Sequence, residues 1–179
     1  GTNDVALKDA NALDLGTVSV GQNLSVIAVG AISDTGVVTV AGTTTLDNSG
    51  GTNAAILLDS ASTYTGNVTF NTGTGSDVTI TDNSDFGIQS GLNVNNLSIT
   101  STGSVTDLGD IDIDGTLTVS AVGQAIDLSG TGNDLTGAVT LTGAAITLED
   151  TTDTSIAGIT ATGALSVTSG GAITQTGAV

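Results

Sequence analysis

Aliphatic residues alternate with small polar residues in short bursts along the whole chain. Representative bursts are Val38–Val40, Val68–Phe70, Leu117–Val119 and Val139–Leu141. A period of two is typical of a strand with one buried face, and Gly, Asn, Asp or Ser bounds most of these bursts. No stretch repeats apolar residues at helical spacing for long enough to indicate a helix. The pattern therefore predicts an all-β chain made of many short strands.

A 32-residue module occurs three times, at residues 5–36, 78–109 and 146–177, and its starts lie 73 and then 68 residues apart. The spacers at 37–77 and 110–145 also match each other, more loosely. A fixed long period indicates one structural unit stacked on copies of itself. We therefore treat residues 1–179 as a single repeat-built solenoid segment. Neither end resembles a cap, so we expect flanking repeats in a longer parent chain.

Two β architectures compete for this pattern. An antiparallel sandwich needs hairpin signals such as Asn-Gly or Asp-Gly, and Asp114-Gly115 is the single such dipeptide. A parallel β-helix instead stacks Val, Ile and Leu ladders in its interior, with a right-handed crossover as the general expectation. Coils of about 22–26 residues, three per superrepeat, would give roughly seven or eight coils and a rod about 35 Å long. We favour the right-handed parallel β-helix.

Composition narrows the function. The net charge is −17, from 18 acidic residues set against the single Lys8, so nucleic acid and anionic lipid are disfavoured as partners. No apolar run approaches the length of a membrane span. The chain has no His and no Cys, which removes the common nucleophile–base pairs. With almost no cationic or aromatic residues to hold a sugar, we predict that the protein is not an enzyme and needs no cofactor.

Calcium is the one metal that the sequence suggests. Asp110, Asp112 and Asp114 resemble the first half of an EF-hand loop, but the twelfth position is Ala121 in place of Glu. Strand alternation explains the same segment with the two intervening Ile side chains inside and the three carboxylates outside. Both interpretations stay open: a calcium site at Asp110, Asp112 and Asp114, or a solvated acidic face.

Other recurring residues have structural and functional interpretations. Asp9, Asp82 and Asp150 share the fifth position of the module and are expected to bind their own turns. Tyr64 and Phe70 align with Leu residues in the next superrepeat, which predicts core positions with the Tyr64 hydroxyl reaching outward.

Thr-x-Thr pairs are frequent, and flat Thr ladders on β-helices can bind ice. The position of Thr79 and Thr81 is, however, occupied by Ala6 and Lys8 in the first module and by a Thr–Glu pair in the third. We therefore expect no ladder in register, and strand preference alone explains the Thr content.

Three segments carry a family resemblance: 5–16, 133–143 and 171–177. They resemble recurring phrases in the repeat regions of large filamentous-haemagglutinin-like bacterial surface adhesins. The resemblance implies export to the cell surface or medium and a right-handed parallel β-helix, although the secretion domain of that family is not recognisable. It favours a structural shaft or spacer of an adhesin. The alternatives are a lateral-face binding module for a host or biofilm glycan or extracellular protein, an ice-binding protein and a polysaccharide-acting β-helix enzyme.

Overall fold

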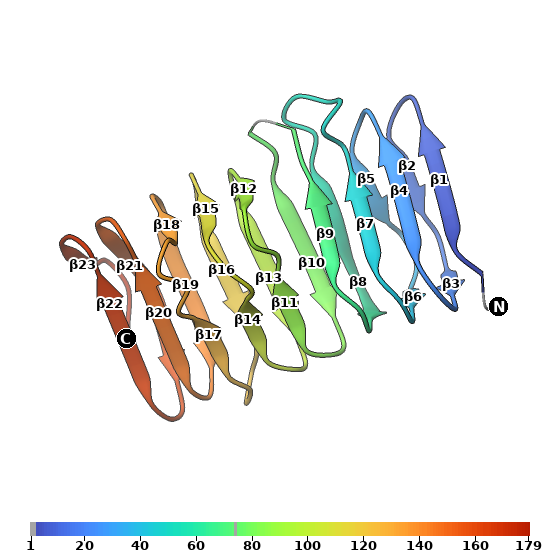
Figure 1. Ribbon diagram of the computed structural model, residues 1–179. Coiled ribbons are helices and arrows are strands. Elements are labelled where there is room, and N and C mark those ends of the chain that lie inside the picture. The colour runs from blue at the N-terminus through green and yellow to red at the C-terminus, as the bar shows by residue number, and fades with distance from the viewer. Residues whose placement is uncertain (1–2, 74) are drawn as a thin grey trace.

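The computed structural model describes residues 3–73 and 75–179 and shows flattened coils stacked along one axis (Figure 1). Those residues form 23 strands and no helix, and every strand pairing is parallel. The coils build a β-solenoid of about eight turns, so the predicted parallel β-helix is confirmed. Within the described ranges, no helix has the length and apolar character needed to cross a membrane.

One sheet runs the length of the solenoid, and we call it the long wall. Its strands, in spatial order, are β2 (Leu13–Leu15), β5 (Ile32–Asp34), β8 (Ile56–Tyr64), β10 (Val78–Asp82), β13 (Leu97–Ser101), β16 (Leu117–Ser120), β19 (Ala138–Gly143), β21 (Thr154–Ala161) and β23 (Ile173–Gln175). β8 bends at a corner, so that its end also pairs with β6 (Val38–Val40), which pairs with β3 (Val18–Val20).

The other walls each cover part of the solenoid. The amino wall consists of β1 (Val5–Asp9), β4 (Leu24–Ala28), β7 (Thr44–Asp47) and β9 (Val68–Asn71). The carboxy wall consists of β11 (Phe86–Ile88), β14 (Val105–Asp107), β17 (Ile126–Leu128), β20 (Ile146–Asp150) and β22 (Leu165–Ser169). The short wall consists of β12 (Leu92–Val94), β15 (Ile111–Ile113) and β18 (Asp134–Leu135).

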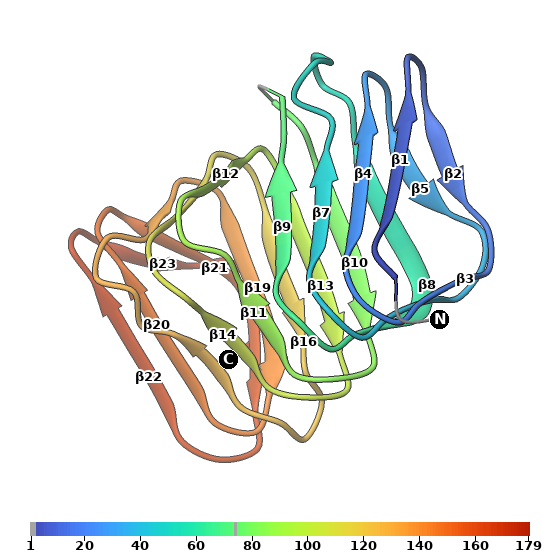
Figure 2. The same ribbon diagram turned by 45° about the vertical axis from the view of Figure 1, so that its right-hand side comes forward.

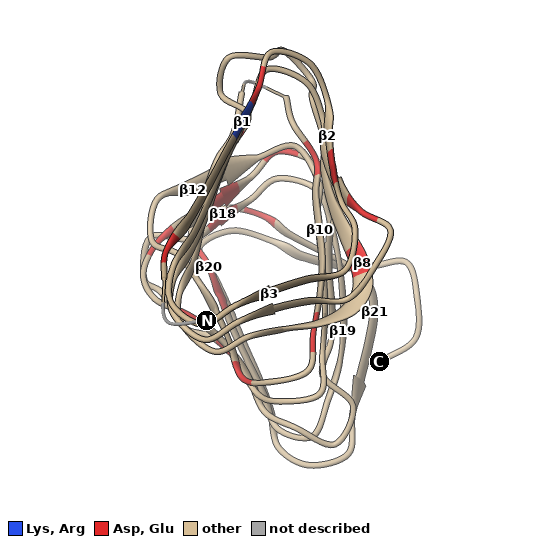
Figure 3. Ribbon diagram, turned by 90° about the vertical axis from the view of Figure 1, so that its right-hand side faces the viewer, with Lys and Arg blue, Asp and Glu red and all other residues tan. Residues whose placement is uncertain are grey.

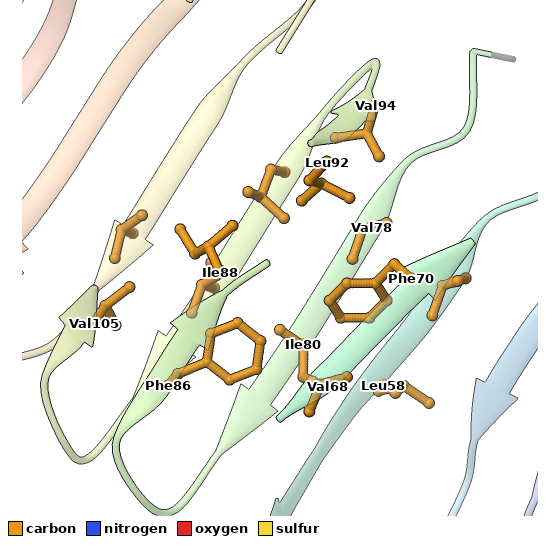
Figure 4. Packing of buried hydrophobic residues seen from close by; sticks show 14 of the residues in the cluster. Leu58, Val68, Phe70, Val78, Ile80, Phe86, Ile88, Leu92, Val94 and Val105 are labelled. Atoms are coloured by element: carbon orange, nitrogen blue, oxygen red, sulfur yellow. The ribbon is translucent and has the colours of Figure 1, made fainter. Parts of the chain in front are cut away.

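A continuous aliphatic core fills the space between the walls. Alternate residues of each strand point inward, so Val139 and Leu141 of β19 are buried while the residue between them faces outward. Figure 4 shows the rings of Phe70 and Phe86 inside the solenoid, with Ile80 between their strands. Each fully buried aliphatic side chain stabilises the fold by roughly 1.5–3 kcal/mol, so stacking like on like in the interior drives the architecture.

The coils are shorter than the sequence suggested. Val5 pairs with Leu24, a step of 19 residues, and corner hydrogen bonds between neighbouring coils span 19 and 20 residues. Only some coils reach 22 or 24 residues, as in the steps that place Asn133 beside Ile111 and Ser62 beside Val38. The predicted range of 22–26 residues fits those coils and is too long for the others, because it assumed that a superrepeat contains a whole number of coils.

The chain of one superrepeat winds through three complete coils and then along one more wall of the solenoid before the next superrepeat begins. The first strands of the three modules are β1, β10 and β20, and they lie in the amino wall, the long wall and the carboxy wall respectively. Figure 3, a view along the solenoid, shows these three strands on different sides of the outline. Equivalent residues of successive superrepeats therefore face different directions.

The corners repeat with the superrepeat. Asp77 accepts from the backbone of Asn96, whose side-chain oxygen accepts from the backbone and hydroxyl of Thr116 one coil further on. Asp4, Asn23 and Thr43 make the same chain of bonds in the first superrepeat. These side chains satisfy backbone donors that leave the strand ladder at the turn, so each corner is held to the next.

At the junction where the amino wall ends, no strand pairing continues the wall among the described residues. The amino wall ends at β9, and the next coil turns toward β12 of the short wall. There the Gln89 side chain accepts from the Phe70 backbone N–H and donates to the Phe70 carbonyl at 3.0 Å. The amide of Gln89 thus replaces a neighbouring strand at the point where the walls change.

Candidate functional site

The acidic strand predicted to hold calcium is β15, on the short wall. Ile111 and Ile113 are buried, and Asp110, Asp112 and Asp114 lie on the outside, as the alternation predicted. Asp110 accepts from the Gly132 backbone at 2.9 Å. The loop geometry of an EF-hand is absent from these described residues, because the segment is a strand with turns at its ends.

Asp112 has its own network. It pairs in register with Asn93 on one side and Asp134 on the other, and the Asn93 side chain donates to it at 2.6 Å. Partial burial raises the pKa of Asp112, and the negative charges of Asp114 and Asp134 raise it further. No group of three or more potential metal-binding side chains converges anywhere in residues 3–73 and 75–179. The calcium site stays a prediction that no such cluster supports.

The recurring acid of the module binds turns, as expected. Asp9 accepts from the Asn11 backbone at 2.7 Å, and Asp150 accepts from the Thr152 backbone and the Thr154 hydroxyl. Asp82 accepts from the Ser84 hydroxyl of its own turn at 3.0 Å and also from the Tyr64 backbone of the preceding coil at 3.0 Å. Asp82 and Asp150 are also buried, which the sequence did not indicate. Because the three acids lie on different walls, they do not form one ligand set.

A buried polar corner surrounds the bend of β8. Asp34 accepts from the Ser60 backbone and the Ser62 hydroxyl, and Ser62 in turn accepts from the Val38 backbone. Burial raises the pKa of both Asp34 and Asp82, which lie on either side of the bend. Every carboxylate or hydroxyl oxygen in this network accepts from a backbone N–H or a hydroxyl of the surrounding strands and turns, so the network has a structural role.

Tyr64 is a core residue, but its hydroxyl does not reach outward. The side chain is buried, and its oxygen has no hydrogen-bond partner among the described residues. Burial raises the pKa of Tyr64 well above its usual value. The alignment with Leu135 predicted the burial correctly, but β8 bends at this point and carries the whole ring inside.

The most regular surface lies on the long wall. Strands β10, β13, β16 and β19 pair in register, and their outward residues form two rows along the solenoid. Figure 2 shows these strands following one another on one side of the molecule. We call the eight outward residues the hydroxyl array: Thr79, Ser98, Thr118 and Thr140 in the first row, and Thr81, Thr100, Ser120 and Thr142 in the second.

The expectation that Thr-x-Thr pairs do not stay in register was wrong for this surface. That expectation compared residues one superrepeat apart, such as Lys8 and Thr81. These residues lie on different walls, because a superrepeat covers one wall more than three full coils. The residues that are neighbours in space are one coil apart, and in these strands each of them is Thr or Ser. A self-comparison at steps of 19–22 residues would have found the array.

The hydroxyl array is neutral and has no internal partners. All eight residues are half-buried or exposed. Within the described part of the chain, none of their hydroxyls forms a hydrogen bond to protein, whereas the corner hydroxyls of Thr43 and Thr116 both bind Asn side chains. None of the 18 acidic residues belongs to the array. The wall therefore presents hydroxyl and methyl groups to solvent at fixed intervals.

The repeated coils, parallel sheets and common core define the class: a repeat protein with β-solenoid architecture. Within that class, the chain belongs to the family described as repeats of unknown function (DUF5649), which matches residues 2–71, 75–142 and 143–179. The repeat unit of the family thus coincides with the superrepeat that starts at Val5, Val78 and Ile146. No curated protein and no solved structure matches the chain.

Proposed function

We propose that this solenoid is a structural shaft in a bacterial surface or secreted adhesin. The observation that carries the proposal is the unbroken stack, in which the long wall pairs strand after strand from β2 to β23 over one aliphatic core. In such a stack each coil contacts only its neighbours, so further coils lengthen the solenoid without changing the packing of the existing ones. The resemblance of segments such as 133–143 to haemagglutinin-like repeats supports the adhesin context.

The surface supports a spacer role. Along the solenoid the large exposed apolar side chains are dispersed: Ile27 lies on the amino wall, Leu57 on the long wall, and Leu108 and Val122 in turns. Leu165, Ile173 and Val179 are exposed in the last coil. An adhesive or oligomeric face would gather them into one patch. Acidic residues cover several sides of the solenoid (Figure 3), and the resulting repulsion discourages edge-to-edge association of a strand-rich rod.

Binding to an array of glycans and extracellular-matrix proteins, with and without calcium, tests the spacer role. Folded protein that gives no saturable signal supports a shaft, whereas a specific saturable signal would replace it with a lateral binding module. Antibodies against residues 3–179 test the location. They should label intact cells that produce the protein, and labelling that requires permeabilised cells would contradict a surface shaft.

A further inference from the structure

The hydroxyl array on β10, β13, β16 and β19 is a two-dimensional lattice. Neighbouring strands lie about 4.8 Å apart, and alternate residues of one strand lie roughly 6.6 Å apart. The register does not shift between β10 and β19, so the two rows run parallel over four strands. An occupant that matches this surface must itself repeat in both directions.

The array is rigid as well as regular. Its members are six Thr and two Ser, and the branched Cβ of Thr restricts its χ1 rotamers. The strands beneath are fixed by ladder bonds on both sides and by buried partners such as Ile99 and Val119. A surface that is already ordered loses little entropy when it binds an ordered partner.

The chemistry of the array suits water. Its hydroxyls have no protein partners among the described residues, so each is free to donate to and accept from water. The Thr methyl groups lie beside them and limit the directions that water can take. Charged side chains, which hold tight shells of oriented water, are absent from the array.

We propose that the hydroxyl array binds the surface of an ice crystal. Ice is neutral, rigid and periodic in two dimensions, and it bonds through the groups that the array offers. A sugar-binding platform would use exposed aromatic rings, but Tyr64, Phe70 and Phe86 are all buried. An anionic polymer would be repelled by the net charge of −17. This function does not depend on the shaft proposal, since it uses the side of the solenoid and not its length.

The array has defined limits. At one end Thr79 pairs with Leu57, and at the other a register shift places Gly158 beside Thr140. Thr160 extends only the second row, beside Thr142. The next superrepeat begins on the carboxy wall, so all eight residues of the array belong to one superrepeat, and Thr160 is the single in-register hydroxyl residue that β21 of the next superrepeat adds. A patch of this size predicts a modest effect on ice growth.

Thermal hysteresis and partition of the purified chain into a growing ice front test the proposal. The wild-type chain should shape ice crystals into facets and enter the ice. Thr118→Tyr places a bulky ring in the centre of the array and should abolish both effects. The matched control is Thr45→Tyr, at the equivalent outward position of β7 on the amino wall, and it should behave as the wild type. Circular dichroism and a thermal melt establish that both variants are folded.

A variant with increased activity is also needed, because the loss of ice binding in Thr118→Tyr could come from misfolding. Ser98→Thr combined with Ser120→Thr completes the array with two further methyl groups and should increase thermal hysteresis at equal concentration. Exclusion of folded wild-type protein from ice would overturn the proposal. Equal losses in Thr118→Tyr and Thr45→Tyr would also overturn it, as would retention on crystalline chitin or cellulose with no effect on ice.

Discussion

The amino wall and the equivalent stretch of the long wall have the same inside and different outsides. β1, β4, β7 and β9 correspond in the repeat to β10, β13, β16 and β19. Both stretches bury Val, Leu or Ile at most inward positions. Outside, the first rows are similar, since the amino wall has Ala6, Ser25, Thr45 and Thr69 there. The second row differs: it reads Lys8, Ile27, Asp47 and Asn71 on the amino wall, where the long wall has only Thr and Ser. Packing restricts the inward positions to similar aliphatic residues, whereas the outward positions can differ in charge and polarity from one superrepeat to the next.

Because each superrepeat covers one wall more than three full coils, the next superrepeat starts on a different wall. Equivalent strands point to different sides, so two superrepeats display their outward residues on different walls. The four strands that begin each coil of one superrepeat therefore share a wall, and the equivalent four strands of the next superrepeat lie on another wall. Sequence differences between superrepeats therefore appear as different surface residues on different walls of the solenoid.

The largest expected effect comes from breaking the shared interior. Val139→Asp on β19 places an unpaired carboxylate in the aliphatic ladder and should cost more than about 4 kcal/mol of stability. Val68→Asp, at the equivalent position of β9, should cost a similar amount, because both side chains are buried. Thermal melts followed by circular dichroism measure both. Thr140→Asp, which points outward beside Val139, is the control, and an equal loss there would refute the inward assignment.

The junction between the two stretches gives the next effect. Gln89→Leu removes both hydrogen bonds to the Phe70 backbone and should cost about 2 kcal/mol, because a donor and an acceptor lose their partner together. Chemical denaturation measures the change in the free energy of unfolding. Gln22→Leu, an exposed residue of a regular coil, is the control. An equal and small effect at both positions would show that Gln89 does not replace a strand.

Acid should stabilise the buried polar corner at the bend of β8. Burial raises the pKa of Asp34 and Asp82, so the folded state holds these protons more tightly than the unfolded state. Their contribution is therefore gained as the pH falls through the folded-state pKa and is lost as the pH rises. Melting temperatures from neutral pH down to the acid range measure it. Protonation of the other carboxylates lowers the net negative charge and so also stabilises the fold as the pH falls. The variants Asp34→Asn and Asp82→Asn distinguish the two causes. Both variants should flatten the pH profile, and an unchanged slope would exclude the two carboxylates.

A smaller change should make the two interiors more alike. Thr44 faces inward on β7 with a buried hydroxyl that has no partner among the described residues, and its counterpart on β16 is Leu117. Thr44→Val keeps the shape and removes the unsatisfied group, so it should stabilise the chain by about 1 kcal/mol. Thr45→Val, which points outward, should change little. A loss of stability in Thr44→Val would mean that the hydroxyl has a partner.

The alternation of apolar and polar residues was enough to predict the class of fold and the direction of each side chain. It placed Val139 inside and Asp112 outside, because a period of two is set by the geometry of a single strand. The coil length was beyond this reasoning, since the visible period of 73 or 68 residues belongs to the superrepeat. The hydroxyl array was missed for the same reason.

Other features leave no local signal in the sequence. Gln89 is one polar residue among many, and its role depends on which walls end beside it. The burial of Tyr64 together with its hydroxyl depends on the bend in β8. The acidic triplet at Asp110, Asp112 and Asp114 was located correctly on an outer face, but its metal binding is a matter for titration with calcium.

The register between coils tests the account most directly, because both the turning of the superrepeat and the hydroxyl array depend on it. The chain has no Cys, so pairs can be introduced cleanly. Thr100 and Ser120 are partners in the structure, at a strand spacing of about 4.8 Å that lies within the range for a disulfide. Oxidation should cross-link Thr100→Cys with Ser120→Cys within one chain and leave Thr100→Cys with Gln124→Cys reduced. The opposite result, with Gln124 as the partner, would require longer coils and would contradict both the turning superrepeat and the array.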